Sequence, residues 1–327
     1  MNFRNIKLLV YTLWGLASYL SVGQNQETLN EIALCKKAST YLNEKFDSYN
    51  IIGLDEGPHG TVRNHKFFLE MLSNDDLAKK IQIIILEFMS NTQQVLLDRF
   101  INGDDVSISD LRLVWRESTQ AHSVNIENPV YLNLLVKIRE LNSRLENKDK
   151  IRVLGGDPSA NWAAIKTLKD YFPTLSQRDV LPSELAIKYG IKENKNVLLI
   201  YGGEHLLKTS DSKRDSTHWT IPYYINKKYP KSIWTIGFFN SKTYKYNKNE
   251  IHLRANTIYN TNGKIGELET AEGTKLSDVF DAVYYLGDYD HWPVGNIESI
   301  DSEFWNELNR RSKILWGQGI DETFKKK

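Results

Sequence analysis

Acidic and histidine side chains follow several apolar runs in this sequence. Four of them come at or just after the end of such a run: Glu56, His59, Glu87 and His205. A histidine beside a carboxylate can take a proton from water as a general base, and the same side-chain types can instead bind a divalent metal ion. The pattern therefore points to hydrolysis, with or without a metal, provided that the fold brings the four side chains together.

Six short runs rich in β-branched and apolar residues are predicted to be β-strands. They are Asn50 to Leu54, Ile81 to Leu86, Ile151 to Leu154, Val197 to Tyr201, Ile233 to Phe239 and Val279 to Leu286. The runs are almost wholly apolar, which is typical of strands buried on both faces of a sheet. Segments with helical spacing separate them, as in the apolar faces around Phe68 and Leu134. This alternation predicts an α/β fold with a central, mostly parallel sheet flanked by helices.

Two regions depart from the alternation. Residues 92–147 keep helical spacing for longer than one crossover requires, which predicts a helical insertion over one end of the sheet. Residues 244–273 alternate polar and aromatic side chains around the turn signal Asn262-Gly263, which predicts a late β-hairpin. Residues 24–327 are expected to form a single domain.

The predicted parallel sheet explains how distant residues could form one site. Carboxyl ends of parallel strands converge on one edge, where α/β proteins bind ligands. Asp157, after Gly155 and Gly156, joins the four residues named above at this edge. A carboxylate at position 87 is costly in a sheet interior unless it is paired or hydrogen-bonded, which favours a functional role. Three other histidines follow no predicted strand and are interpreted as structural: His65, His122 and His252.

Composition and missing motifs narrow the chemistry. The chain has 42 basic and 41 acidic residues, so its charge gives no reason to expect a nucleic-acid partner. Cys35 is the only cysteine, which excludes an intramolecular disulfide and a cysteine-based metal site. The sequence contains no Gly-x-Ser-x-Gly elbow, Walker A loop, Gly-x-Gly-x-x-Gly fingerprint or His-Glu-x-x-His motif. Histidine and carboxylate chemistry remains.

The first 23 residues have the pattern of a signal peptide. Arg4 and Lys7 precede an uncharged apolar stretch from Leu8 to Val22, and the small residues Ser21 and Gly23 end it. The stretch is short for a membrane span. We therefore expect a periplasmic or secreted protein that meets the membrane only through this segment during export.

Several of these motifs resemble the erythromycin esterase-like family. Leu54 to Thr61 is similar to the family's first motif, a Gly-Glu-x-Thr-His-Gly signature after a strand, and Ile84 to Glu87 to its second acidic motif. The third motif resembles Gly155-Gly156-Asp157, and the late histidine motif resembles Val197 to His205. In that late motif the family usually has two histidines, the first of which falls on Gly202.

The resemblance implies roles for individual residues. The histidine matching His59 would be the base that activates water against an ester, Glu56 and Glu87 would orient it, and His205 would assist at the carbonyl or leaving group. Arg63 and Asp157 are expected to bind the substrate, a small molecule. Two later aromatic residues, Trp219 and Trp292, are also expected to bind it as walls of a pocket, and the alternative for both is that they pack against edges and loops of the sheet.

Other members of the superfamily suggest two alternative hypotheses for the function of this protein. It includes haem-binding uptake proteins of the ChaN type, and Tiki or TraB-like proteins of which some are metal-dependent proteases. A metal-dependent hydrolase would use Glu56, His59 and His205 as ligands. The hydrolase with a histidine base needs no cofactor, whereas the two alternatives would need haem or a divalent metal. Carboxylates beside the histidine favour the base.

Overall fold

The computed structural model describes residues 38–209, 219–240, 253, 255–262, 264–269, 273–287 and 300–324. The predicted leader, Cys35 and Trp292 lie outside these residues. Among the residues described, no helix is both long and apolar enough to cross a membrane.

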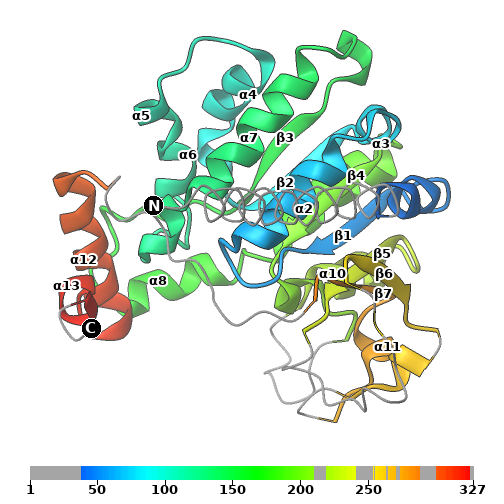
Figure 1. Ribbon diagram of the computed structural model, residues 1–327. Helices are drawn as coiled ribbons and strands as arrows, with labels where there is room; N and C mark the ends of the chain where they lie inside the picture. Colours follow the sequence, from blue (N-terminus) through cyan, green and yellow to red (C-terminus); the bar gives the residue numbers. More distant parts are fainter. Residues whose placement is uncertain are drawn as a thin grey trace, which may run out of the picture.

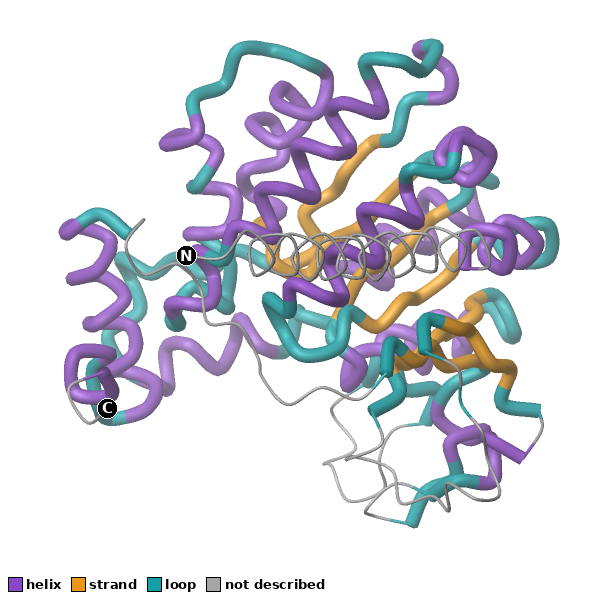
Figure 2. The backbone as a smooth tube through the Cα atoms, in the orientation of Figure 1, coloured by secondary structure: helices purple, strands orange, loops and turns teal. Residues whose placement is uncertain are grey.

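A seven-stranded sheet forms the centre of the structure (Figures 1 and 2). Its strands are β1 (Ile51–Asp55), β2 (Ile83–Ser90), β3 (Arg152–Asp157), β4 (Val197–Tyr201), β5 (Ile233–Phe238), β6 (Thr257–Asn260) and β7 (Ala282–Tyr285). The strand order is β3-β2-β4-β1-β5-β7-β6, and every neighbouring pair is parallel except β6 with β7. All six strands predicted from apolar runs are present, so the prediction of a mostly parallel α/β sheet is confirmed.

Helices cover both faces of this sheet. The helices on the way from β1 to β3 are α2 (Val62–Leu72), α3 (Asp75–Lys80), α4 (Gln94–Asn102), α5 (Ile108–Leu111), α6 (Leu113–Arg116) and α7 (Pro129–Asn142). The later ones are α8 (Leu168–Leu175), α9 (Val180–Ala186), α10 (Ile221–Lys228), α11 (Leu276–Val279), α12 (Ser302–Trp316) and α13 (Ile320–Phe324). Helices α4 to α7 form the helical insertion expected between β2 and β3, and they lie together above the sheet in Figure 1.

Alternate residues of the strands point into two separate apolar cores. Ile52 and Leu54 of β1 pack with α2, α4 and α7 on one face, whereas Ile51 packs with α9 and α10 on the other. Phe68 and Leu134, which lie in the two helical faces predicted from spacing, are buried in the first core. Burial of the strands on both faces explains why their sequences show no polar alternation.

The predicted late hairpin falls partly outside the described residues. Within the segment 244–273, the described residues contribute β6, whose antiparallel partner is β7. Thr257 lies opposite Tyr285, and Asn260 opposite Ala282. The antiparallel pair therefore closes one end of the sheet.

The last long helix, α12, packs beside the loop that follows β3 and beside α6 (Figure 1). Arg310 donates hydrogen bonds to the carbonyl oxygens of Ile165 and Trp162, at 2.9 and 2.6 Å. Arg311 donates to the carbonyl oxygens of Arg116 and Ala121, at 2.7 and 2.8 Å. These contacts fix α12 at the side of the sheet where β2 and β3 end.

Candidate functional site

The loop after β1 brings a glutamate and a histidine into direct contact. Glu56 Oε1 lies 2.5 Å from His59 Nδ1. The Glu56 side chain is 3% exposed and the His59 side chain 41% exposed, so the histidine faces solvent while its partner is buried. Gly57 adopts a positive φ of 69° in this turn, where a Cβ would lie 2.2 Å from Asn64 Nδ2. The tight turn, which needs glycine, therefore sets the glutamate–histidine contact.

Asp55 anchors the same loop from the last position of β1. Its carboxylate accepts hydrogen bonds from the backbone N–H groups of Gly57, at 2.7 Å, and Phe238, at 2.9 Å. Burial raises the pKa of Asp55 to about 6, and the two N–H groups oppose that rise. Asp55 thus supports the loop without pointing a free carboxylate at solvent.

Glu87, in the middle of β2, is contacted by donor groups of four residues that lie in three different segments. Its Oε1 accepts from Gln120 Nε2 at 2.5 Å and Arg178 Nη2 at 2.7 Å, and lies 3.3 Å from His205 Nε2. Its Oε2 accepts from the backbone N–H of Gly202 at 2.6 Å. Burial favours the neutral acid, but the charge and hydrogen bond of His205, with the charges of His59 and Arg178, hold the pKa of Glu87 well below its usual range. A buried glutamate is therefore kept ionised.

Both ring nitrogens of His205 are engaged. Nδ1 lies 2.6 Å from Asp179 Oδ1, and Nε2 lies 3.3 Å from Glu87. Burial disfavours protonation, yet the two carboxylates outweigh it and raise the pKa of His205 to about 10. At neutral pH His205 is an imidazolium that bridges two carboxylates.

Gly202 lies close to both His59 and Glu87. A Cβ placed on Gly202 would lie 3.0 Å from His59 Cε1 and 3.3 Å from Glu87 Oε2. The absence of a side chain at this position leaves room for the His59 ring beside Glu87. The structure thus brings together Glu56, His59, Glu87 and His205, as the spacing predicted; their catalytic role remains a prediction.

The ionisation of His59 follows from its neighbours. Burial lowers its proton affinity, but the hydrogen bond and charge of Glu56, together with the charge of Glu87, raise the pKa of His59 to about 9. Its Nδ1 is hydrogen-bonded to Glu56. Its Nε2 lies on the side of Gly202 and has no hydrogen-bond partner among the described residues. Nε2 is therefore the atom placed to exchange a proton with a bound molecule.

Arg178, Asp179 and Gln120 complete the site, and sequence analysis missed all three. Arg178 Nε lies 3.8 Å from Asp157 Oδ2, so this arginine links Glu87 with Asp157. The three follow no strand, and a polar residue near a helix end gives no signal that separates it from a solvent-exposed one. We use the name polar cluster for the following residues: Glu56, His59, Glu87, Asp157, Arg178, Asp179 and His205.

The predicted substrate-binding residues have different surroundings. Asp157 is buried and accepts from the N–H of Thr119 at 2.7 Å and from its hydroxyl at 2.6 Å. Burial raises the pKa of Asp157 to about 7, against the lowering effect of Arg178 and Thr119. Arg63 is exposed, with Nη2 3.2 Å from a Cβ placed on Gly287 beyond β7. Trp219 packs at α10, its ring 5.7 Å from that of Tyr223.

His65 is buried in an aromatic environment, in keeping with its interpretation as structural. Its ring lies 5.6 Å from that of Phe68 and 5.2 Å from that of Tyr131, and neither ring nitrogen has a hydrogen-bond partner among the described residues. Burial, with a smaller effect of the charge on His59, lowers the pKa of His65 to about 3. The folded protein therefore holds this histidine neutral.

This burial predicts a loss of stability in acid. Below pH ~6.5 the unfolded chain protonates His65 and the folded chain does not, so this residue's stabilising contribution is lost as the pH falls from about 6.5 toward 3. From about pH 7 to about pH 4.5 the loss should be about 2–3 kcal/mol. We expect His65→Phe to remove that part of the pH dependence in urea unfolding. Equal pH dependence in both proteins would contradict this.

The described residues contain no group of three or more histidine, cysteine, aspartate or glutamate side chains arranged to hold a metal ion. The trio expected as ligands in a metal-dependent hydrolase, Glu56, His59 and His205, is accordingly not grouped in that way. Instead, the Nδ1 atoms of the two histidines contact carboxylates, His59 with Glu56 and His205 with Asp179.

Comparison with known proteins supports the fold at low sequence identity. No protein-family model and no curated protein matches the sequence. A mutant of erythromycin esterase EreC in its open conformation is 10% identical, with a TM-score of 0.54 over 80% of this chain and 95% of that chain. A succinoglycan biosynthesis protein is 9% identical, with a TM-score of 0.56 over 76% of this chain and 90% of that one.

A third solved structure, a protein from Bacillus cereus, is 14% identical, with a TM-score of 0.52 over 75% of this chain and 90% of that one. Together these likenesses show that the chain has the fold found in the erythromycin esterase-like proteins. The resemblance of the sequence motifs to the erythromycin esterase-like family had implied this same fold.

Proposed function

We propose that this protein is an exported hydrolase in which His59 activates water for attack on an ester or amide bond of a small molecule. The observation that carries the proposal is the contact between buried Glu56 and the half-exposed ring of His59. A carboxylate on Nδ1 fixes the orientation of the ring and leaves Nε2, on the side of Gly202, available to accept a proton, which is the arrangement that a general base needs. The fold shared with an erythromycin esterase agrees with this chemistry.

The reaction can be written with the groups that the site provides. His59 Nε2 takes a proton from water as the water oxygen attacks the carbonyl carbon, and Glu56 stabilises the imidazolium that forms. The tetrahedral intermediate collapses by breaking the bond to the leaving oxygen or nitrogen. That atom receives the proton from His59, which gives an acid and an alcohol or amine and restores the neutral histidine.

His205 receives a different role from the one that the family resemblance implied. Because both of its nitrogens contact carboxylates, we assign it to holding Glu87 and Asp179 in place rather than to direct contact with the substrate. Its positive charge, with that of Arg178, keeps Glu87 ionised beside His59. Export rests on the leader pattern of residues 1–23.

The raised pKa of His59 predicts an alkaline activity profile. The base must be neutral to accept a proton, so kcat/KM for an activated ester such as p-nitrophenyl acetate should rise with pH until the pKa of about 9 is reached. Only about 1% of His59 is neutral at pH ~7, so we expect an increase of about 50-fold between pH ~7 and pH ~9, after correction for spontaneous hydrolysis. A profile that is flat or peaks near pH 6 would contradict the assignment.

The same assay separates the rival readings. Treatment with a chelator should leave the rate unchanged if His59 acts as a base. Loss of activity on chelation, with recovery on addition of a divalent metal, would instead make His59 a metal ligand. A protein that hydrolyses none of a panel of esters, lactones and amides, but binds haem with a Soret shift that depends on His59 or His205, would establish the binding-protein reading.

A further inference from the structure

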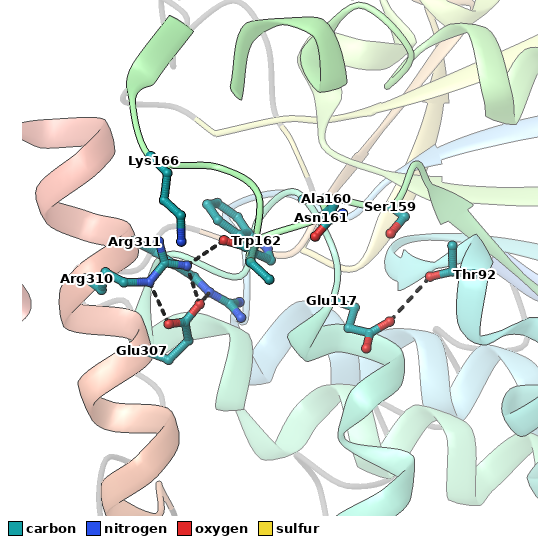
Figure 3. Close-up of a pocket in the computed structure, with 11 residues that line it drawn as sticks. Thr92, Glu117, Ser159, Ala160, Asn161, Trp162, Lys166, Glu307, Arg310 and Arg311 are labelled. Carbon is teal, nitrogen blue, oxygen red and sulfur yellow. Dashed lines mark hydrogen bonds and ion pairs between the residues drawn. The ribbon is translucent and has the colours of Figure 1, made fainter. Parts of the chain in front are cut away.

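A cavity of about 690 Å³ lies beside the polar cluster, between the loop after β3 and helix α12 (Figure 3). Its walls come from four parts of the chain that are separated in sequence. The residues that line it include Thr92, Glu117, Ser159, Asn161, Trp162 and Lys166, together with Arg310 and Arg311 of α12. A cavity of this size is within the range of small-molecule sites.

Short chain segments connect this cavity to the polar cluster. Glu117 lines the cavity, while Gln120, three residues later, donates to Glu87 at 2.5 Å. On the other side, Ser159 lines the cavity only two residues after Asp157. The backbone at Ser118 pairs with that at Ser159, so the two connecting segments lie side by side. The cavity is therefore held next to the polar cluster by two short segments that pair with each other.

One end of the cavity is positively charged. Arg310 and Arg311 both bind the single carboxylate of Glu307, with N–O distances of 2.6 and 2.8 Å. Lys166 adds a third cation, and Figure 3 shows its side chain extending toward the two arginines. No ion pair of Lys166 is found within the described part of the chain. Glu307 pairs with the two arginines and not with Lys166, so Lys166 leaves this end with an excess of positive charge that suits a carboxylate or phosphate.

The opposite end offers hydrogen-bonding groups. Glu117, Thr92 and Ser159 lie across the cavity from the cations in Figure 3. The Glu117 carboxylate accepts from Gln93 Nε2 at 2.7 Å, which fixes its direction. Asn161 adds an amide between the two ends. Carboxylate, hydroxyl and amide groups together match the hydroxyl groups of a ligand.

The middle of the cavity has a rigid aromatic wall. Trp162 is buried, donates from Nε1 to the carbonyl oxygen of Ser118 at 2.9 Å, and stacks on Tyr171 with ring centres 5.5 Å apart. Tyr171 stacks on the indole and the Arg311 guanidinium lies over it at 4.7 Å, so Trp162 fixes the shape of the cavity rather than stacking on a ligand. The wall is therefore already in place before a ligand arrives.

We infer that this cavity binds the remote part of the substrate, and that this part is a hydroxylated organic acid, with its anionic group at Lys166 and its hydroxyl groups toward Glu117. The inference rests on the proposed function for the reacting end of the substrate. It adds that the compound is polar and negatively charged, so the substrate is not a wholly apolar ester.

Binding of glucuronate by the full-length mature protein tests this inference without any turnover. Glucose, which has similar hydroxyl groups but no carboxylate, is the matched neutral compound. By isothermal titration calorimetry we expect a Kd of about 1–10 mM for glucuronate and affinity at least about tenfold weaker for glucose. Lys166→Ala should weaken glucuronate binding about five- to tenfold, because it removes a charge-assisted hydrogen bond.

Lys169→Ala provides the matched control, since Lys169 is an exposed lysine on α8 that does not line the cavity. Its affinity for glucuronate should equal that of the unmodified protein. Equal binding of glucose and glucuronate, insensitivity to Lys166→Ala, or no detectable binding of glucuronate would each overturn the inference. Lysine-dependent binding by a protein that hydrolyses no ester would keep the cavity assignment and remove the proposed function.

Discussion

Replacing His59 with alanine is expected to lower kcat for ester hydrolysis about 10²–10⁴-fold, the usual contribution of a general base. The loss should be confined to the chemical step. His59 is 41% exposed and belongs to neither apolar core, so truncation opens no cavity in either core. Steady-state kinetics with an activated ester should therefore show a collapse in kcat with KM nearly unchanged. The free energy of unfolding should fall by about 1–3 kcal/mol at most, because buried Glu56 loses its partner.

Glu56→Gln gives a second, more specific readout of the same dyad. An amide oxygen can still accept a hydrogen bond from Nδ1, but it lacks the charge that raises the pKa of His59. The variant should keep part of its activity. The midpoint of the rise in kcat/KM with pH should move toward the ordinary histidine value of about 6.5. If His59→Ala retains more than about a tenth of the activity, or if Glu56→Gln leaves the profile in place, another group supplies the base.

The sheet and the central part of the site could be predicted because both depend on local sequence. Strands buried on both faces need uninterrupted apolar runs, and these are visible in a single sequence as in β2 and β4. Once the strands are known to be parallel, the residues after them must share an edge. Glu56 after β1 and His205 after β4 follow directly from that rule. Glu87 does so only in part, because β2 continues to Ser90, four residues beyond its predicted end, and Glu87 therefore lies within the strand.

The outer part of the site could not be predicted because it depends on packing between distant elements. Arg178 and Asp179 lie between α8 and α9, and only the return of that segment to the sheet places them on Glu87 and His205. The cavity depends on α12 docking against the loop after β3 through Arg310. No local pattern indicates where a C-terminal helix will dock.

Glu87→Gln is expected to affect stability and activity together. The carboxylate takes hydrogen bonds from Gln120, Arg178 and the N–H of Gly202, and an amide would point its own N–H groups at one of these donors. The variant also leaves the cations of Arg178 and His205 without their shared anion. Loss of one partner of such a buried charge cluster typically costs about 3–5 kcal/mol in the free energy of unfolding. Urea unfolding measures this change directly.

Glu127→Gln separates the effect of lost stability from an effect on the site. Glu127 is also a buried acid bound to an arginine, with Arg116 Nε at 2.6 Å, but it lies outside the polar cluster. We expect both variants to unfold more easily, while Glu127→Gln keeps its activity per folded molecule.

Glu87→Gln should in addition shift the remaining activity to lower pH, because Glu87 contributes to the raised pKa values of both His59 and His205. The sign of that shift follows from charge alone. Removing an anion destabilises a nearby imidazolium, so His59 loses its proton at lower pH and the rise in kcat/KM shifts to lower pH. If the variant is destabilised but the midpoint of its pH profile stays near pH ~9, Glu87 has only a structural role, and Glu56 alone raises the pKa of His59.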